Sequence, residues 1–549
     1  MKTGGRPVKS PEADDYTLAI AGTGAMGQGI AQVAAAGGVQ VLLYDTREGA
    51  ATAAFDTVAG RLTRLVEKGR MSAAEADAAI DRLHPVPTTA DFAPADAVVE
   101  AIVEDLDAKR GLFTEVEAVV GPDCLIASNT SSIPIAAIAR ACKKRDRIAG
   151  LHFFNPVPLM KLVEVIRAAE TSDAAVAALT ALGKRLTRVP VTVKDSPGFL
   201  VNMGGRAFTT EGLRIVHEGV ATPAQVDAVM RDCWGFRMGP FELMDLTGID
   251  VNYPVSQIVW EGYQGDQRLE TRPNHRAMFD AGLLGRKTGQ GWYAYEGGKP
   301  APGAPSPDHV TGAAPARRVC LAEEFLEQAV SDMVRRQDGG PGNGADEDAH
   351  DGPEGEDLLS DAPLDPAVQE FCEEIGLEIV PDDGVSPIVA APIGQDATTI
   401  ATICELDHRR LVCIDLLGNP AKRVTVMTAP GADPAARDAL AAAIAESGRK
   451  VTAITDSPGF VGQRVAAMVA NLGCYMAEIG LASPEDIDTA MQLGLNYPHG
   501  PLALAEQIGA PETLDVLKEL HETTGEDRYR PTMWLKRRAM LGLPVHTPS

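Results

Sequence analysis

A glycine-rich turn near the N-terminus constrains the fold of this chain more than any other feature. The apolar run at residues 18–21 predicts a short buried strand. Three glycines follow it in G-x-G-x-x-G spacing, namely Gly22, Gly24 and Gly27. Small residues then predict a helix over 26–36, and a second apolar run at 39–44 predicts a strand that leads into Asp45. This order of elements is the pattern of a dinucleotide-binding βαβ unit.

Each part of this unit has a chemical task. Gly22 permits the tight turn, Gly24 lets a pyrophosphate approach the backbone, and Gly27 lets the helix pack closely on the strand. The helix N-terminus offers N–H groups and a positive dipole end to the phosphates. Asp45 is placed to accept hydrogen bonds from the adenosine ribose, and its charge would repel a 2′-phosphate, so we expect NAD. Arg47 keeps NADP as the alternative, because an arginine there can hold a 2′-phosphate.

Charge and composition exclude several classes of function. A net charge of −26 disfavours nucleic acid and anionic membranes as partners. No run approaches 18 consecutive apolar residues, so a membrane span is not expected, and the N-terminus lacks the apolar core of a signal peptide. The eight cysteines form no C-x-x-C and no metal-ligand spacing. We therefore expect reduced thiols, no metal and a cytoplasmic location.

Strand and helix patterns alternate beyond Asp45. Further strands are predicted by three apolar runs, at 97–104, 125–127 and 148–151. Such alternation predicts a parallel, doubly wound sheet, in which ligands gather at the carboxyl ends of the strands. Four polar residues fall at these predicted ends: Asp45, Glu104, Ser131 and His152.

A histidine and a glutamate in the segment 150–166 form the chemical centre of the prediction. If Pro156 and Pro158 turn the chain between adjacent strands, His152 and Glu164 can meet across that turn. A histidine held by a carboxylate is a general base, whereas a hydrogen-bonded structural histidine is the alternative interpretation. Beside a nicotinamide site, the pair predicts alcohol oxidation by proton abstraction and hydride transfer.

The second half of the chain repeats part of the first. The sequence DSPGF at 195–199 recurs at 456–460, an offset of 261 residues, and the same register aligns Asp227 with Asp488 and Gly248 with Gly509. A register held over more than fifty residues indicates a duplicated helical domain. The segment between the copies lacks a second G-x-G-x-x-G.

These patterns predict an α/β plus all-α protein of six segments. Residues 337–363 carry nine acids and no lysine or arginine, which is typical of a disordered linker. The expected segments are a flexible tail (1–15), an NAD-binding Rossmann-like domain (16–194), a first helical domain (195–295), a partly disordered acidic linker (296–365), a degenerate α/β segment (366–455) and a second helical domain (456–549).

The motifs together resemble the 3-hydroxyacyl-CoA dehydrogenase family. The resemblance covers essentially all of 16–295 and rests on GTGAMGQGIA (22–31), VVEAIVED (98–105), ASNTSS (127–132), GLHFFNPVPLMKLVEV (150–165), DSPGFLVN (195–202), MGPFEL (238–243) and GRKTGQGWY (285–293). It implies an active site in the cleft between a Rossmann-like domain and a helical domain. It also implies reversible, NAD-dependent oxidation of an L-3-hydroxyacyl-CoA to the 3-ketoacyl-CoA.

The resemblance also implies a role for each site residue. His152 removes the hydroxyl proton, Glu164 holds and supports His152, and Ser131 and Asn202 bind the substrate oxygen. The positions that match the cofactor site are Gly22, Gly24, Met26, Gly27, Asp45, Glu104, Lys109, Ser131 and Asn155. Lys68 matches a residue near the coenzyme A phosphates, and Arg61 stands where the family often has a serine, so its role stays open.

The duplicated half resembles the longer members of the family, including those of phenylacetate breakdown, and the paired helical domains of multifunctional fatty-acid oxidation proteins. Gln463 takes the place of Asn202, Thr425 takes that of Glu164, and the segment 411–427 has no histidine. We therefore expect a structural second half that forms a pseudo-dimer within one chain, with a homodimer also possible.

Two other functions compete with this prediction. One is a dehydrogenase of a free 3-hydroxy acid, and the other is a non-catalytic dinucleotide-binding protein. The second would be favoured by loss of His152, Glu164, Ser131 or Asn202, all of which are present. The sequence leaves open the length of the acyl chain and whether its far end is a carboxylate.

Overall fold

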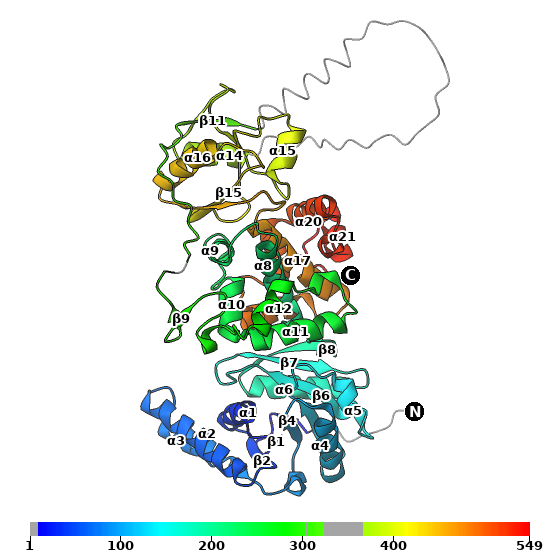
Figure 1. The fold of residues 1–549 in the computed structure, drawn as a ribbon. Coiled ribbons are helices and arrows are strands. Elements are labelled where there is room, and N and C mark those ends of the chain that lie inside the picture. Colours follow the sequence, from blue (N-terminus) through cyan, green and yellow to red (C-terminus); the bar gives the residue numbers. More distant parts are fainter. Residues whose placement is uncertain (1–8, 304, 323–365) are drawn as a thin grey trace, which may run out of the picture.

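A computed structural model describes residues 9–303, 305–322 and 366–549. The acidic stretch expected to be disordered, 337–363, lies outside the described residues. In Figure 1 the first α/β domain lies at the bottom, the helices of both copies occupy the middle, and the second α/β unit lies at the top.

The first α/β domain is built on an eight-stranded sheet in the order β3-β2-β1-β4-β5-β6-β7-β8. Its strands are β1 (Thr17–Ala21), β2 (Gln40–Tyr44), β3 (Leu83–Pro85), β4 (Ala97–Glu100), β5 (Leu125–Ser128), β6 (Ile148–Phe153), β7 (Leu162–Arg167) and β8 (Val189–Lys194). Its helices are α1 (Ala25–Ala36), α2 (Ala50–Glu67), α3 (Ala73–Ile80), α4 (Leu106–Val119), α5 (Ile135–Ala139) and α6 (Asp173–Arg185). The predicted Rossmann-like fold is confirmed.

Three details of the sheet differ from the sequence prediction. The sheet is not wholly parallel, because β7 runs antiparallel to β6 and β8 runs parallel to β7. The short connection after β6 is the reason, since parallel neighbours need a crossover of a dozen or more residues. β4 ends at Glu100 and not at Glu104, because the amide of Ile102 turns back onto the Glu100 carboxylate. β6 continues to Phe153, so that His152 lies within the strand.

Two sets of helices repeat the same design. The first comprises α7 (Val201–Gly204), α8 (Arg206–His217), α9 (Pro223–Asp232), α10 (Pro240–Thr247), α11 (Ile249–Gly262) and α12 (Pro273–Asp280). The second comprises α17 (Gly462–Glu478), α18 (Pro484–Leu495), α19 (Pro501–Ile508), α20 (Ala510–Thr524) and α21 (Met533–Leu541). Asp227 accepts hydrogen bonds from the first amides of α10, and Asp488 does the same for α19. A carboxylate satisfies these otherwise unpaired helix donors in both copies.

The second α/β unit has a six-stranded sheet in the order β12-β11-β13-β14-β15-β16. Its strands are β11 (Arg318–Leu321), β12 (Glu378–Ile379), β13 (Ile388–Ala390), β14 (Leu411–Ile414), β15 (Arg423–Met427) and β16 (Lys450–Ile454), and its helices are α14 (Pro366–Glu374), α15 (Ala397–Ile403) and α16 (Pro434–Glu446). β14, β15 and β16 repeat the antiparallel and parallel pairing of β6, β7 and β8. The expected linker of 296–365 therefore contains a strand of this sheet, β11, together with most of the small hairpin of β9 (Tyr295–Glu296) and β10 (Lys299–Pro300).

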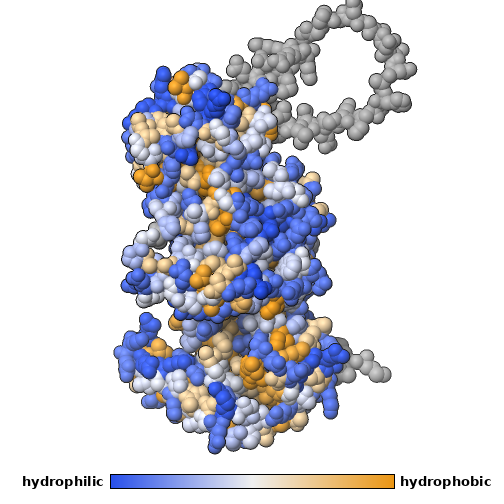
Figure 2. Space-filling view, viewed as in Figure 1, coloured by the Kyte–Doolittle hydropathy of each residue, from blue (hydrophilic) through white to orange (hydrophobic). Residues whose placement is uncertain are grey.

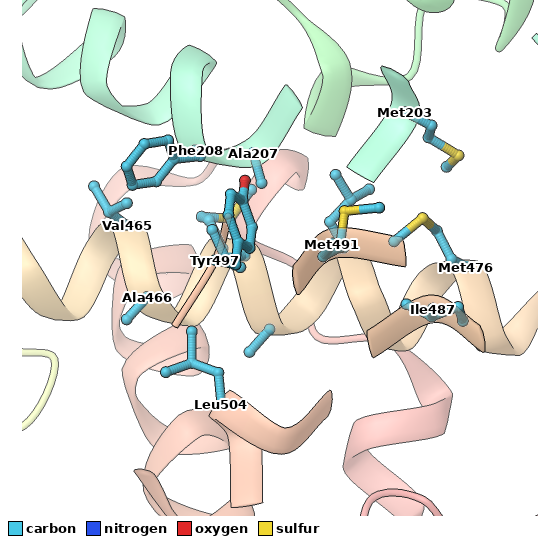
Figure 3. Close-up of a cluster of buried hydrophobic side chains, with 14 of the residues drawn as sticks. Met203, Ala207, Phe208, Val465, Ala466, Met476, Ile487, Met491, Tyr497 and Leu504 are labelled. Carbon is cyan, nitrogen blue, oxygen red and sulfur yellow. The ribbon is translucent and has the colours of Figure 1, made fainter. Parts of the chain in front are cut away.

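The two helical copies share one hydrophobic core. Helix α17 packs against α8, and Figure 3 shows Met203 and Phe208 of the first copy beside Met476, Met491 and Tyr497 of the second. All five side chains are buried. On the face shown in Figure 2, hydrophilic residues cover most of the surface and apolar residues form small groups.

The termini and surface add two further observations. Part of the expected N-terminal tail is folded back, because the Lys9 ammonium lies 3.0 Å from the Asp96 carboxylate and the Arg185 guanidinium donates to the Ala13 carbonyl. Of the helices in the described ranges, none has the length and apolar character that crossing a membrane requires.

Candidate functional site

A cavity of about 620 Å³ lies at the carboxyl ends of β1, β2 and β4. Gly22, Gly24 and Asp45 line it, as do Ile102 and Leu112. Gly22 has a φ of +98°, and a Cβ there would lie 2.5 Å from the Ala101 carbonyl oxygen. Gly24 is the N-cap residue of α1 and faces open space, so backbone amides at the start of α1 are accessible to an anion. The residues present therefore fit a dinucleotide pyrophosphate.

Close packing below this turn requires the third glycine. A Cβ on Gly27 would lie 1.9 Å from the carbonyl oxygen of Gly22, a distance that no side chain tolerates. Gly27 thus holds α1 against the turn that starts it, as the sequence pattern predicts.

Asp45 follows β2 and forms one wall of the cavity. Its carboxylate accepts hydrogen bonds from the amide of Thr23 at 2.9 Å and from the amide of Arg47 at 3.0 Å. Burial raises the pKa of Asp45, but the hydrogen bonds from Arg47 and Thr23 outweigh that effect and hold it well below its usual value. Asp45 is therefore a fixed anion in the wall of this cavity.

A charge network around the buried Lys109 organises the loop after β5. Lys109 is 1% exposed and lies between Glu100, at 2.6 Å, and Glu104, at 3.2 Å. Glu104 accepts hydrogen bonds from Thr130 and from the amide of Ser131. Burial raises the pKa of Glu104, yet the Thr130 hydrogen bond and the Lys109 charge together lower it below its ordinary value. Glu104 and Lys109 thus fix the position of Ser131.

The predicted His–Glu pair is present and buried. His152 in β6 lies directly opposite Glu164 in β7, and Nδ1 of His152 is 2.6 Å from Oε2 of Glu164. The other oxygen, Oε1, accepts the amides of Leu200 and Val201 at 3.1 and 2.9 Å. Because an ionised carboxylate only accepts, Nδ1 donates, so that in the neutral imidazole Nε2 carries the lone pair. Nε2 makes no hydrogen bond within the described residues and is not enclosed.

Asn202 contacts Ser131 next to the residues that hold Glu164. The Asn202 amide donates to the Ser131 carbonyl oxygen at 3.4 Å. Asn202 lies one residue beyond Val201, whose amide binds Glu164. The DSPGFLVN segment therefore supplies both the amide that contacts Ser131 and the donors that orient the Glu164 carboxylate.

The structure also places the remaining predicted residues. Asn155 is exposed after β6, and Met26 is partly buried in the first turn of α1. Lys68 is exposed directly after α2. Arg61 in α2 donates to the Gln28 side chain at 3.0 Å and so links α2 to α1.

The equivalent place in the second half has different chemistry. The amide of Asp415 pairs with the carbonyl of Thr425, so these residues occupy the positions of His152 and Glu164. Gln463 donates to Asp415 at 3.0 Å and accepts the Gly394 amide at 2.8 Å. Burial raises the pKa of Asp415 to about 6, although the Gln463 hydrogen bond opposes that change. This second centre has no imidazole base.

Comparison with known proteins decides the family. The description "3-hydroxyacyl-CoA dehydrogenase, NAD binding domain" matches residues 17–196, and "3-hydroxyacyl-CoA dehydrogenase, C-terminal domain" matches 198–295 and again 459–544. The chain belongs to the 3-hydroxyacyl-CoA dehydrogenase family. The double match of the C-terminal domain also agrees with the duplication seen in the sequence.

Relatives of this dehydrogenase fall into long and short forms. It is 35% identical to the 3-hydroxyadipyl-CoA dehydrogenase of Escherichia coli K12 over 96% of this chain and 98% of the relative. A crystal structure of 3-hydroxybutyryl-CoA dehydrogenase from E. coli K12 is 33% identical and covers 96% of this chain and 98% of its own, with a TM-score of 0.77. A probable 3-hydroxybutyryl-CoA dehydrogenase of Deinococcus radiodurans is 40% identical over 50% of this chain and 99% of the relative.

This family assignment establishes the reaction and the cofactor. The enzyme is an oxidoreductase that uses NAD to oxidise a 3-hydroxyacyl-CoA to the 3-ketoacyl-CoA. The predictions of family, reaction and cofactor are confirmed.

Sequence reasoning missed several residues that build the site. Glu100 and Ser128 share a 2.6 Å hydrogen bond beneath the loop of Ser131. Asp195 accepts the first amides of α5, as Asp456 does for α15. The repeated DSPGF motif was the available signal for both aspartates, but a sequence does not show which amides they bind.

Proposed function

We propose that His152 is the general base of the reaction and Glu164 its positioning partner. The 2.6 Å contact from Nδ1 to Glu164, with Oε1 held by two backbone amides, is the observation that carries this proposal. It leaves Nε2 of His152 to take the hydroxyl proton, while Glu164 stabilises the imidazolium that forms. Ser131 and Asn202 bind the substrate oxygen.

NAD, when bound, supplies the acceptor for the hydride that leaves C3. The chain's own residues account for the proton: it passes from the substrate hydroxyl to Nε2 of His152, and it returns along the same path in the reduction. A carbonyl forms at C3, where Asn202 and Ser131 hold the oxygen. Burial of His152, which is 6% exposed, limits competition by water.

Glu164→Gln tests this assignment. The amide removes the charge that supports a protonated imidazole, so we expect kcat to fall and the acidic limb of the kcat/KM profile to move to lower pH. The measurement is a pH–rate profile of 3-hydroxyacyl-CoA oxidation. A lower rate with an unmoved profile would show that Glu164 only maintains the fold.

We propose that the cofactor contacts involve Gly22, Gly24, Met26, Gly27 and Asp45, with Ser131 and Asn155 near the nicotinamide end. Lys109 is too enclosed to reach a ligand, so we propose that Lys109 and Glu104 act by holding the Ser131 loop. Lys68, exposed at the end of α2, is proposed to bind the coenzyme A phosphates.

Asp45→Ala should raise the KM for NAD by about tenfold and reduce discrimination against NADP, because the ribose loses a charged acceptor and a 2′-phosphate loses its repulsion. Steady-state kinetics with both cofactors measure the effect. Asp45→Asn is the matched control, since it keeps a side-chain oxygen that can accept from Thr23 without the charge. An unmodified enzyme that prefers NADP would contradict this role of Asp45.

We also propose that the helical copies form a pseudo-dimer, so that one chain supplies both partners of a pair. The support is their shared core and the buried ion pair of Arg464 with Glu211, at 2.8 Å, which crosses between the copies. We further propose that whole chains form a homodimer and that the enzyme is cytoplasmic.

A further inference from the structure

One part of the cavity that contains Gly24 and Asp45 is apolar. Its lining there consists of Ile102 and Val103, which follow β4, and of Ala108 and Leu112 in α4; these four residues form the base pocket. Val103 is 67% exposed, so its side chain is available to an apolar ligand. The proposed contacts of Gly24 with the pyrophosphate and of Asp45 with the ribose leave the base pocket for the purine of the dinucleotide.

A carboxylate, that of Glu115, lines the same cavity next to the base pocket. Glu115 lies three residues after Leu112 in α4, so the two side chains share one face of the helix. Among the described residues, Asp45 and Glu115 are the two acids in the lining. The Asp45 carboxylate is already bound by the amides of Thr23 and Arg47. Glu115 therefore supplies a second, separate acceptor to the cavity.

A buried hydroxyl fixes the position of the Glu115 carboxylate. Thr89 begins the 3₁₀ helix η1 (Thr89–Phe92), is 5% exposed, and donates to Oε1 of Glu115. Phe92 of the same helix packs edge-on against Tyr44, with ring centres 6.0 Å apart, and Tyr44 also lines the cavity. Throughout the described ranges, Oε2 of Glu115 has no hydrogen-bond or ion-pair partner. Oε1 is thus held in place, while Oε2 is free to accept from a ligand.

A carboxylate can distinguish purines by the group at position 6. An ionised carboxylate only accepts hydrogen bonds. The 6-amino group of adenine donates, whereas a 6-oxo group accepts and would be repelled. If Glu115 only tied α4 to η1, the identity of the base would have no effect on binding. Its place in the lining and its free oxygen favour recognition of the base.

We propose that Glu115 determines the base specificity of the cofactor site by accepting a hydrogen bond from the 6-amino group of adenine. The inference rests on the proposed cofactor contacts of Gly24 and Asp45. Thr89 is the positioning residue, because its hydroxyl holds the Glu115 carboxylate beside the base pocket. The enzyme therefore discriminates against a dinucleotide whose purine is hypoxanthine, since the 6-oxo group would face the carboxylate.

The test compares the binding of NADH with that of reduced nicotinamide hypoxanthine dinucleotide, in which a 6-oxo group replaces the 6-amino group. Titration of the nicotinamide fluorescence, without any acyl-CoA, gives both dissociation constants. We expect the unmodified enzyme to bind NADH about tenfold more tightly, the order expected of a hydrogen bond to a charged acceptor. Glu115→Gln carries both an acceptor and a donor, so the preference should fall below about twofold. Glu115→Ala should weaken the binding of NADH but not that of the hypoxanthine dinucleotide.

Matched controls separate recognition of the base from folding and from binding of the ribose. Glu117 lies on the same helix, accepts the amides of Lys143 and Lys144 at 2.8 Å, and is not part of the cavity lining. Glu117→Gln should therefore leave the ratio of the two dissociation constants unchanged. Asp45→Ala should weaken both dinucleotides by the same factor, because they share one ribose.

Two outcomes would overturn the inference. One is equal binding of both dinucleotides by the unmodified enzyme, and the other is a preference for NADH that Glu115→Gln retains. Unchanged binding of both dinucleotides in Asp45→Ala would instead reject the proposed cofactor contacts on which the inference rests.

Discussion

Replacing His152 by alanine should lower kcat by about 10²- to 10⁴-fold, which is the usual contribution of general acid–base catalysis. NAD binding should be retained, because the cavity lined by Gly24 and Asp45 does not include His152. The measurements are steady-state turnover of a 3-hydroxyacyl-CoA and fluorescence titration with NADH.

His546→Ala is the matched control for this prediction. His546 also contacts a carboxylate, with Nε2 2.8 Å from Asp488, but it belongs to the second helical copy. Its removal should leave kcat within about twofold of the unmodified value once the folded fraction is taken into account. A His152 variant with full turnover would remove the imidazole from the mechanism.

Removal of the second half should strongly destabilise the part of the chain that remains. A fragment of residues 1–303 ends before β11 and would expose Met203 and Phe208, which are buried against the second copy. It would also remove Arg464 and Arg528, the two arginines of the second copy that pair with the Glu211 carboxylate. We expect aggregation or loss of most turnover, measured by light scattering and by activity.

Supplying the missing half separately tests the same idea. Residues 305–549, expressed as a second chain, should restore solubility and turnover if the helical copies need each other. A 1–303 fragment that is monomeric, soluble and fully active would show that the second copy is dispensable.

Local patterns were enough to predict the first βαβ unit and the contact between His152 and Glu164. The glycines and Asp45 lie within thirty residues of one another and indicate one βαβ unit. His152 and Glu164 are on neighbouring strands that a short connection joins. The duplication was visible as a fixed offset between two copies of one motif. These features are patterns of residues along the chain, so they can be recognised without a structure.

Contacts between distant segments could not be predicted in this way. Glu104 was expected at a strand end beside the cofactor, but β4 stops at Glu100, and Glu104 holds the Ser131 loop through partners 26 to 28 residues away. Strand β11, which precedes residues 323–365, pairs with β13, which follows them.

The buried ion pair between the copies also determines which copies can pair. At the 261-residue offset, Arg464 corresponds to Met203 and Glu211 corresponds to Leu472, so the mirror image of this pair is apolar. Two first copies would set Glu211 against Met203, and two second copies would set Arg464 against Leu472. Each arrangement would bury a lone charge, whereas one first and one second copy bury none. The duplicated helices therefore pair as one first and one second copy, and two like copies from different chains would not replace that arrangement.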